Sequence, residues 1–167
     1  MYLDASPFGL GGMLTEDDKL VSWFWSPLSC HDSEIHRRAI GDSDGQQVWE
    51  ALVVLVATRT WSSRWVGRKT TITAKSDNIA ALSMLASLKS KVSSLICREV
   101  AFEMCKSSFQ PRFVEHIPGV FNYSPDALSR RGDPNYAHSH IKLPGSLEAT
   151  IPVRDWSYYR TLPAQRG

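Results

Sequence analysis

The feature that most constrains the fold is a run of about fifteen residues, from Gln47 to Trp61, which is apolar at almost every position after Val48. A helix that is apolar all round leaves no polar face for solvent, so we expect a buried helix here. A buried pair of strands is the alternative, because Val53 to Val56 is rich in β-branched residues, but strands rarely exceed about ten residues. One acid, Glu50, lies within the run. A buried carboxylate is costly unless a cation, a basic partner or a raised pKa compensates it.

Composition places the chain among ordinary globular domains, because its 167 residues are 43% apolar and 22% charged. The net charge of +2 is too small to predict nucleic-acid binding by itself, so any basic surface must be local. Cys30, Cys97 and Cys105 suit neither a disulfide framework nor a zinc ribbon, which predicts reduced thiols in an intracellular protein. No signal peptide precedes the first predicted strand and no apolar run reaches about 18 residues. We therefore expect no membrane span, and a cytoplasmic or nuclear rather than secreted protein.

The order of predicted elements gives the fold class. Three short strands at 1–6, 10–15 and 20–25 are joined by tight turns, as in an antiparallel meander. The central helix at 47–61 follows, then a strand at 69–74, helices at 79–88 and 93–106, a strand at 112–117 and a short last helix. We expect Ser43 or Asp44 to cap the central helix, and Ser124 to cap the last one with Pro125 at its first position. The pattern predicts an α/β fold with a mixed five-stranded sheet, three antiparallel strands then two parallel ones, and helices on both faces.

Two further stretches lack such periodicity. Residues 30–44 carry two histidines, a cysteine and acids, but their spacing matches no known metal-ligand pattern, so a solvated connection is favoured over a metal site. Residues 132–167 are interrupted by proline and glycine, and we interpret them as a tail or linker that Trp156, Tyr158 and Tyr159 could dock on a domain at 1–131. The first strand is short, which suggests a piece of a longer polypeptide.

Four acids lie on four different predicted elements. Asp4 is in the first strand, Glu50 on the buried helix, Asp77 at the end of a strand, and Asp126 in the first turn of the last helix. Sites in open α/β sheets form beyond the carboxyl ends of strands, where these acids could meet. Carboxylates held together raise one another's pKa, whereas divalent cations would compensate them. Read one by one, the same acids could be a strand-end turn acid, the partner of a local Arg, a helix cap and a first-turn acid.

The flanks of these acids carry a family resemblance. The segments 4–12, 50–52 and 76–82 resemble the acidic motifs of ribonuclease H domains that follow reverse transcriptases in retrotransposons. The segment from His116 to Arg130 is similar to the closing motif of these domains in gypsy-like and tyrosine-recombinase retroelements. The resemblance covers about residues 1–131. It implies a ribonuclease H-like fold, two Mg²⁺ ions that Mn²⁺ can replace, and hydrolysis of the RNA strand of RNA–DNA hybrids, with a polymerase domain upstream in the parent polyprotein.

The resemblance also implies roles for single residues. Asp4, Glu50, Asp77 and Asp126 would be catalytic metal ligands, and His116 would assist proton transfer or product release, unless it only makes a structural hydrogen bond. The expected substrate contacts are Asn78, Asn122, Lys89 and Lys91. For Asn122 the alternative role is to fix the geometry of the loop. A second basic cluster could bind phosphate or simply be a solvated helix end; it comprises Arg59, Arg64, Arg68 and Lys69.

Two other function classes stay open. One is a catalytically inactive remnant that keeps the fold as a nucleic-acid-binding or structural module of a polyprotein. The other is a different nuclease or an integrase-like enzyme of the same fold, which would cleave duplex DNA.

Overall fold

The computed structural model describes residues 1–68, 71–89, 93–107, 111–136 and 141–162. Five strands form one sheet: β1 (Tyr2–Ser6), β2 (Gly9–Glu16), β3 (Lys19–Pro27), β4 (Ile72–Ser76) and β5 (Pro111–His116). The α-helices are α1 (Cys30–His36), α2 (Gln46–Thr60), α3 (Ile79–Ser87), α4 (Ser94–Ser107) and α5 (Tyr123–Ser129). Short 3-10 turns lie at 43–45, 62–64, 119–121, 145–147 and 156–158.

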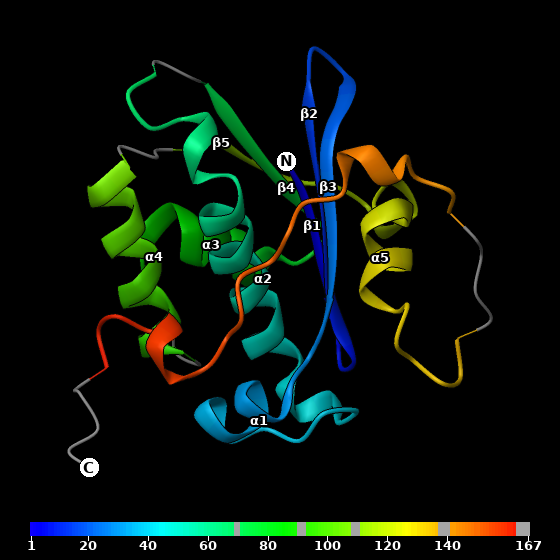
Figure 1. Ribbon diagram of the computed structural model, residues 1–167, viewed down its shortest axis with the longest axis vertical. Coiled ribbons are helices and arrows are strands. Elements are labelled where there is room, and N and C mark those ends of the chain that lie inside the picture. The colour runs from blue at the N-terminus through cyan, green and yellow to red at the C-terminus, as the bar shows by residue number, and fades with distance from the viewer. Residues whose placement is uncertain (69–70, 90–92, 108–110, 137–140, 163–167) are drawn as a thin grey trace.

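The strand order in the sheet is β3-β2-β1-β4-β5. β1 pairs antiparallel with β2, β2 antiparallel with β3, and β4 lies parallel to both β1 and β5. Figure 1 shows α1 to α4 on one side of the sheet and α5 on the other. The predicted α/β fold is therefore confirmed, and the arrangement is consistent with a ribonuclease H-like sheet.

The predicted buried helix is α2. Its residues from Val48 to Thr58 are all buried, because the helix lies between β1 and β2 on one side and α3 and α4 on the other. Trp49, Leu52 and Leu55 are fully buried in the core. Burial on every side explains the missing polar face, and it places Glu50 deep in the molecule, next to the central strand.

On the opposite face, α5 approaches the sheet very closely. A Cβ atom at Gly11 of β2 would lie 2.5 Å from the carbonyl oxygen of Pro125 and 2.8 Å from the backbone nitrogen of Ser129. The Ser6 hydroxyl of β1 donates a hydrogen bond of 2.7 Å to the carbonyl oxygen of Ser129. The lack of a side chain at Gly11 and the hydroxyl of Ser6 thus set how near α5 can come to β1.

Several local predictions are wrong. Residues 30–36 form α1 rather than a solvated connection, because Ser29 caps the helix and the Asp32 carboxylate accepts a hydrogen bond from the backbone N–H of Ser29. Gly45 stands at the N-cap of α2 and makes no side-chain cap bond, so neither Ser43 nor Asp44 caps it. Asn122 stands at the N-cap of α5, which places Ser124 inside the helix.

The segment after Arg131 packs against the rest of the molecule where the structure describes it. Arg154 is 5% exposed, and its guanidinium donates two hydrogen bonds, of 2.9 and 2.8 Å, to the fully buried carboxylate of Asp32 in α1. Tyr159 is buried, and its hydroxyl lies 2.8 Å from Nε2 of His36. In Figure 1 this segment runs across α2 toward α4. The boundary at 131 and the linker role stay predictions.

Within the described residues, no helix is long and apolar enough to cross a membrane. Among the described residues, Cys30, Cys97 and Cys105 form no disulfide.

Candidate active site

Asp4 stands near the middle of the central strand and is 5% exposed. Ser129 of α5 donates a hydrogen bond of 2.5 Å to its Oδ2, and the side-chain amide of Asn122 lies 3.4 Å from its Oδ1. Burial raises the pKa of Asp4 to about 7; the Ser129 bond counteracts this, and the negative charges of Asp126 and Asp77 add to the rise. The carboxyl is therefore held in place by α5 and the loop before it, and the charge of Arg130 offsets only part of the rise in its pKa.

Glu50 approaches the same place from α2 and is 4% exposed. Gln46, one turn earlier, donates hydrogen bonds of 2.8 Å to Oε1 of Glu50 and 2.6 Å to the carbonyl oxygen of Ala5, so it joins the acid to β1. Burial raises the pKa of Glu50 well above its usual value, and the charge of Asp4 raises it further. Its second oxygen, Oε2, is buried and has no hydrogen-bond partner among the described residues.

Asp77 follows the carboxyl end of β4 and is half-buried. The closing loop passes beside it, because a Cβ atom at Gly119 would lie 3.1 Å from its Oδ2. His116 is exposed at the end of β5, and its Nε2 lies 3.0 Å from the carbonyl oxygen of Asp77. His116 therefore lies next to Asp77. Its hydrogen bond to the backbone of Asp77 is also the contact expected if the histidine has only a structural role.

Asp126, in the first turn of α5, is half-buried and already has a cationic partner. Nε of Arg130 donates a hydrogen bond of 2.6 Å to its Oδ1, and the hydroxyl of Tyr136 lies 3.5 Å from its Oδ2. The guanidinium of Arg130 also lies over the ring of Tyr136, 5.6 Å from its centre. The charge of Asp126 is therefore compensated by Arg130, one helical turn away.

The four acids come from the middle of β1, from α2, from the carboxyl end of β4 and from α5. Asp4 is influenced by the charges of Asp126 and Asp77, and Glu50 by those of Asp4 and Asp77, so all four share one electrostatic environment. Two are buried, whereas Asp77 and Asp126 are half-buried and open toward solvent. Such a cluster favours either protonated carboxyls or bound cations.

The donor chemistry of this cluster fits divalent cations. Mg²⁺ prefers carboxylate oxygens and water, and the unpartnered Oε2 of Glu50 is an oxygen of that kind. Two features oppose a ready-made site. Arg130 occupies an oxygen of Asp126, and in the described part of the chain no three His, Cys, Asp or Glu side chains are close enough to hold an ion. Cation binding therefore requires the acids to draw together and Asp126 to exchange its partner.

The predicted substrate contacts lie in different settings. Asn78 caps α3 by accepting a hydrogen bond from the backbone N–H of Ala81, and it remains half-buried beside Asp77. Asn122 is fully buried and donates to the carbonyl oxygen of Leu3, which is the loop-geometry role. Lys89 is exposed just after α3, and Lys91 lies outside the described residues.

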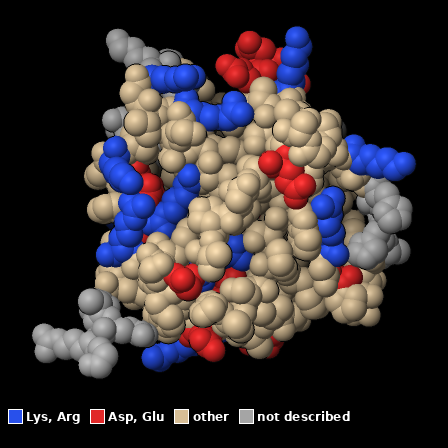
Figure 2. Space-filling model, in the orientation of Figure 1, with Lys and Arg blue, Asp and Glu red and all other residues tan. Residues whose placement is uncertain are grey.

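The residues of the second basic cluster lie in different environments. Arg59 is buried in ion pairs with Glu99 and Glu103 of α4, at 2.5 and 2.9 Å, so it is not available to phosphate. Arg64 and Arg68 are exposed, and Lys69 lies outside the described residues. On the face shown in Figure 2, Lys and Arg side chains gather on the side where α4 lies.

Sequence reasoning missed the side chains that hold the acids. Gln46 is one turn before Glu50, and Ser129 and Arg130 are three and four residues after Asp126. Helical spacing alone puts such residues on the same face as the acid, so a search at those offsets would have found them.

Comparison of the chain with protein-family models, with curated proteins and with solved structures finds no match.

Proposed function

We propose that this protein is a divalent-cation-dependent nuclease of the ribonuclease H type, which hydrolyses the RNA strand of RNA–DNA hybrids. The observation that supports the proposal is that the charges of Asp4, Glu50, Asp77 and Asp126, which come from four different segments, act on one another. Their sequence contexts, which resemble those of retroelement ribonuclease H domains, supply the substrate class.

Each side chain has a part in this proposal. Asp4, Glu50, Asp77 and Asp126 would hold two Mg²⁺ ions, or Mn²⁺ in their place. When bound, the ions supply charge stabilisation for the attacking water and for the leaving oxygen of the phosphodiester. Gln46 and Ser129 keep the two buried acids aimed at the site. His116, exposed beside Asp77, is placed to move a proton at the edge of the site or to help the product leave.

Replacement of one acid tests the proposal. Asp77→Asn keeps the size of the side chain but removes its charge, so Mg²⁺-dependent hybrid cleavage should be lost while the circular dichroism spectrum and Tm stay near those of the unchanged protein. Asp18→Asn is the matched control, because Asp18 is exposed in the turn between β2 and β3. Full hybrid cleavage by Asp77→Asn would refute the assignment.

A second function has its own support. Arg130 neutralises Asp126, and the described residues do not form a ready ion site, which favours an inactive ribonuclease H-like module that binds nucleic acid or has a structural role in a polyprotein. Binding of the hybrid without cleavage in either Mg²⁺ or Mn²⁺ would favour this module. Cleavage of duplex DNA would instead indicate another nuclease of the same fold.

A further inference from the structure

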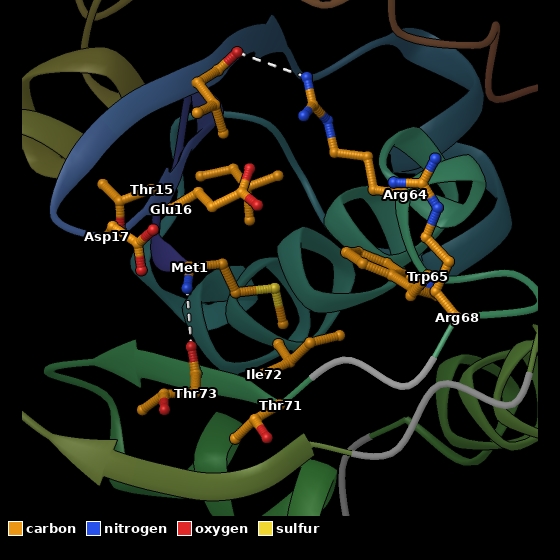
Figure 3. Close-up of a pocket in the computed structure, with 12 residues that line it drawn as sticks. Met1, Thr15, Glu16, Asp17, Arg64, Trp65, Arg68, Thr71, Ile72 and Thr73 are labelled. Atoms are coloured by element: carbon orange, nitrogen blue, oxygen red, sulfur yellow. Dashed lines mark hydrogen bonds between the residues drawn. The ribbon is translucent and has the colours of Figure 1, made fainter.

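Arg130 is a basic residue that lies directly beside the acids of the candidate site. Among the ion pairs of the described residues, its pair with Asp126 is the one that involves an acid of that site. Burial raises the pKa of Asp4, and the charge of Arg130 counteracts part of this rise. Arg64 and Arg68, by contrast, border a separate cavity of about 280 Å³ beside the end of β2 and the start of β4 (Figure 3). Arg130 therefore supplies part of the positive charge that a cation bound at the acids would supply.

The pair between Arg130 and Asp126 is close but only partly shielded from water. Nε of Arg130 lies 2.6 Å from Oδ1 of Asp126, yet the two side chains are 42% and 30% exposed. An exposed ion pair of this kind changes an equilibrium by up to about fivefold. A divalent cation carries twice the charge of a guanidinium and prefers carboxylate oxygens, so Asp126 can exchange Arg130 for it.

A guanidinium that leaves Asp126 remains close to the acids. The ring of Tyr136 already lies under Arg130, 5.6 Å from the guanidinium carbon, and a cation can keep such a contact without its carboxylate partner. Arg130 also directly follows α5, which the hydrogen bond of 2.5 Å from Ser129 to Asp4 holds against β1. The freed side chain therefore stays at the edge of the candidate site.

We propose that Arg130 is a substrate-binding residue that stays paired with Asp126 until a divalent cation binds at the acids. Arg130 then gives up Asp126, and its guanidinium binds a phosphate group of the RNA–DNA hybrid. A planar guanidinium suits phosphate, because it can donate two parallel hydrogen bonds to it. The inference rests on the proposed function, since it needs a cation at the four acids and a nucleic acid in front of them.

Cation affinity tests the exchange at Asp126. Arg130→Gln keeps a polar side chain but removes its charge, so this variant should bind Mn²⁺ up to about fivefold more tightly than the unchanged protein. Arg131→Gln is the matched control, because it removes the same charge from the next residue, whose guanidinium lies over the rings of Trp23 and Trp25. Calorimetric titration of the full chain with Mn²⁺ at pH 8 measures both affinities. If Arg130→Gln binds Mn²⁺ no more tightly than Arg131→Gln, the exchange is wrong.

The salt dependence of hybrid binding tests the phosphate contact. With Ca²⁺ in place of Mg²⁺, the slope of log affinity against log salt should be smaller by about 1 for Arg130→Gln than for the unchanged protein, since one phosphate contact is lost. In a chelator, where Arg130 stays on Asp126, the two slopes should agree. Arg130→Lys keeps the charge and should restore the slope in Ca²⁺, and Arg131→Gln should match the unchanged protein in both conditions. Equal slopes for Arg130→Gln and the unchanged protein in Ca²⁺ would overturn the phosphate contact.

Both experiments measure binding, so their outcome is separate from that of the cleavage assay. A protein that cleaves the hybrid but shows neither difference would contradict the role of Arg130 and leave the proposed function in place. A protein that shows both differences but does not cleave the hybrid would contradict the proposed nuclease activity and leave the role of Arg130 in place.

Discussion

Asp4 is the residue at which folding and the proposed chemistry conflict. Its pKa is raised to about 7 in the folded chain, mainly by burial, whereas an unfolded aspartate titrates near its ordinary value of 3.8. Between these two values the native state holds a proton that the unfolded state has lost. Stability without metal therefore falls as pH rises through this window.

Asp4→Asn should remove the part of that dependence that comes from Asp4, because an amide carries no titratable proton, while the buried Glu50 keeps its own contribution. Relative to this variant, the unchanged chain should lose roughly 2–4 kcal/mol of unfolding free energy between about pH 4 and 7. Urea unfolding in a metal chelator, at several pH values, measures the difference. His36, whose pKa burial lowers to about 4, has the opposite effect in the same window, but it is present in both proteins and cancels. Parallel profiles would contradict the prediction.

The sequence was sufficient to predict that Glu50 is buried, because helix periodicity is a local signal. It was not sufficient to predict the ion pairs of Arg59. A basic residue at a helix end is usually solvated, and only the docking of α4 on α2 turns it into the buried partner of Glu99 and Glu103. Contacts over such sequence distances leave no local pattern.

At the scale of elements, the position of α5 decides the position of Asp126. The helix lies against β2 at Gly11, where any side chain would contact the backbone of Pro125 and Ser129. A helix pushed away from the sheet would also carry Ser129 away from Asp4.

Gly11→Ala should therefore cost about 1–3 kcal/mol of unfolding free energy by overpacking and reduce hybrid cleavage. Gly145→Ala is the control, since a Cβ atom there meets nothing within 4 Å. Chemical denaturation and hybrid-cleavage rates measure the two effects. If Gly11→Ala and Gly145→Ala behave alike, α5 is not held as we describe.

The caps of α2 and α5 and the existence of α1 were element-level errors. The polar composition of 30–44 favours a loop on its own, but Ser29 and Asp32 cap each other's backbone across the first turn of a helix. That reciprocal cap has a sequence signature, which is Ser followed three residues later by an acid. The prediction of a loop relied on the polar composition of the segment and did not use this signature.

At the scale of the whole molecule, the segment at 141–162 stabilises the sheet domain from outside. It adds the isolated bridge of Glu148 to Trp23 on β3, the Arg154–Asp32 ion pair on α1, and the bonds of Thr161 to Glu99 on α4. Proline-rich sequence predicted a linker with docking aromatics, and sequence alone could not predict the buried ion pair, because its two partners are 122 residues apart.

Arg154→Met should lower the free energy of unfolding by about 3–5 kcal/mol, because it leaves the buried carboxylate of Asp32 without its cation. The double variant Asp32→Asn with Arg154→Met should recover part of this loss. Arg160→Met is the matched control, since that side chain is 46% exposed and should change stability by less than about 1 kcal/mol. Urea denaturation of the three variants checks the prediction, which fails if Arg154→Met and Arg160→Met have similar midpoints.

The central place of β1 has a consequence for the order of synthesis. The ribosome produces this strand first and its neighbour β2 soon afterwards, but β4, which lies on its other side, begins only at Ile72. During translation the hairpins of β1 to β3 must therefore wait with the edge of β1 unpaired, and this edge is a site for pairing with other nascent chains. The slow step in assembling this molecule is then expected to be the arrival of β4, and a translational pause before residue 72 would prolong the exposure.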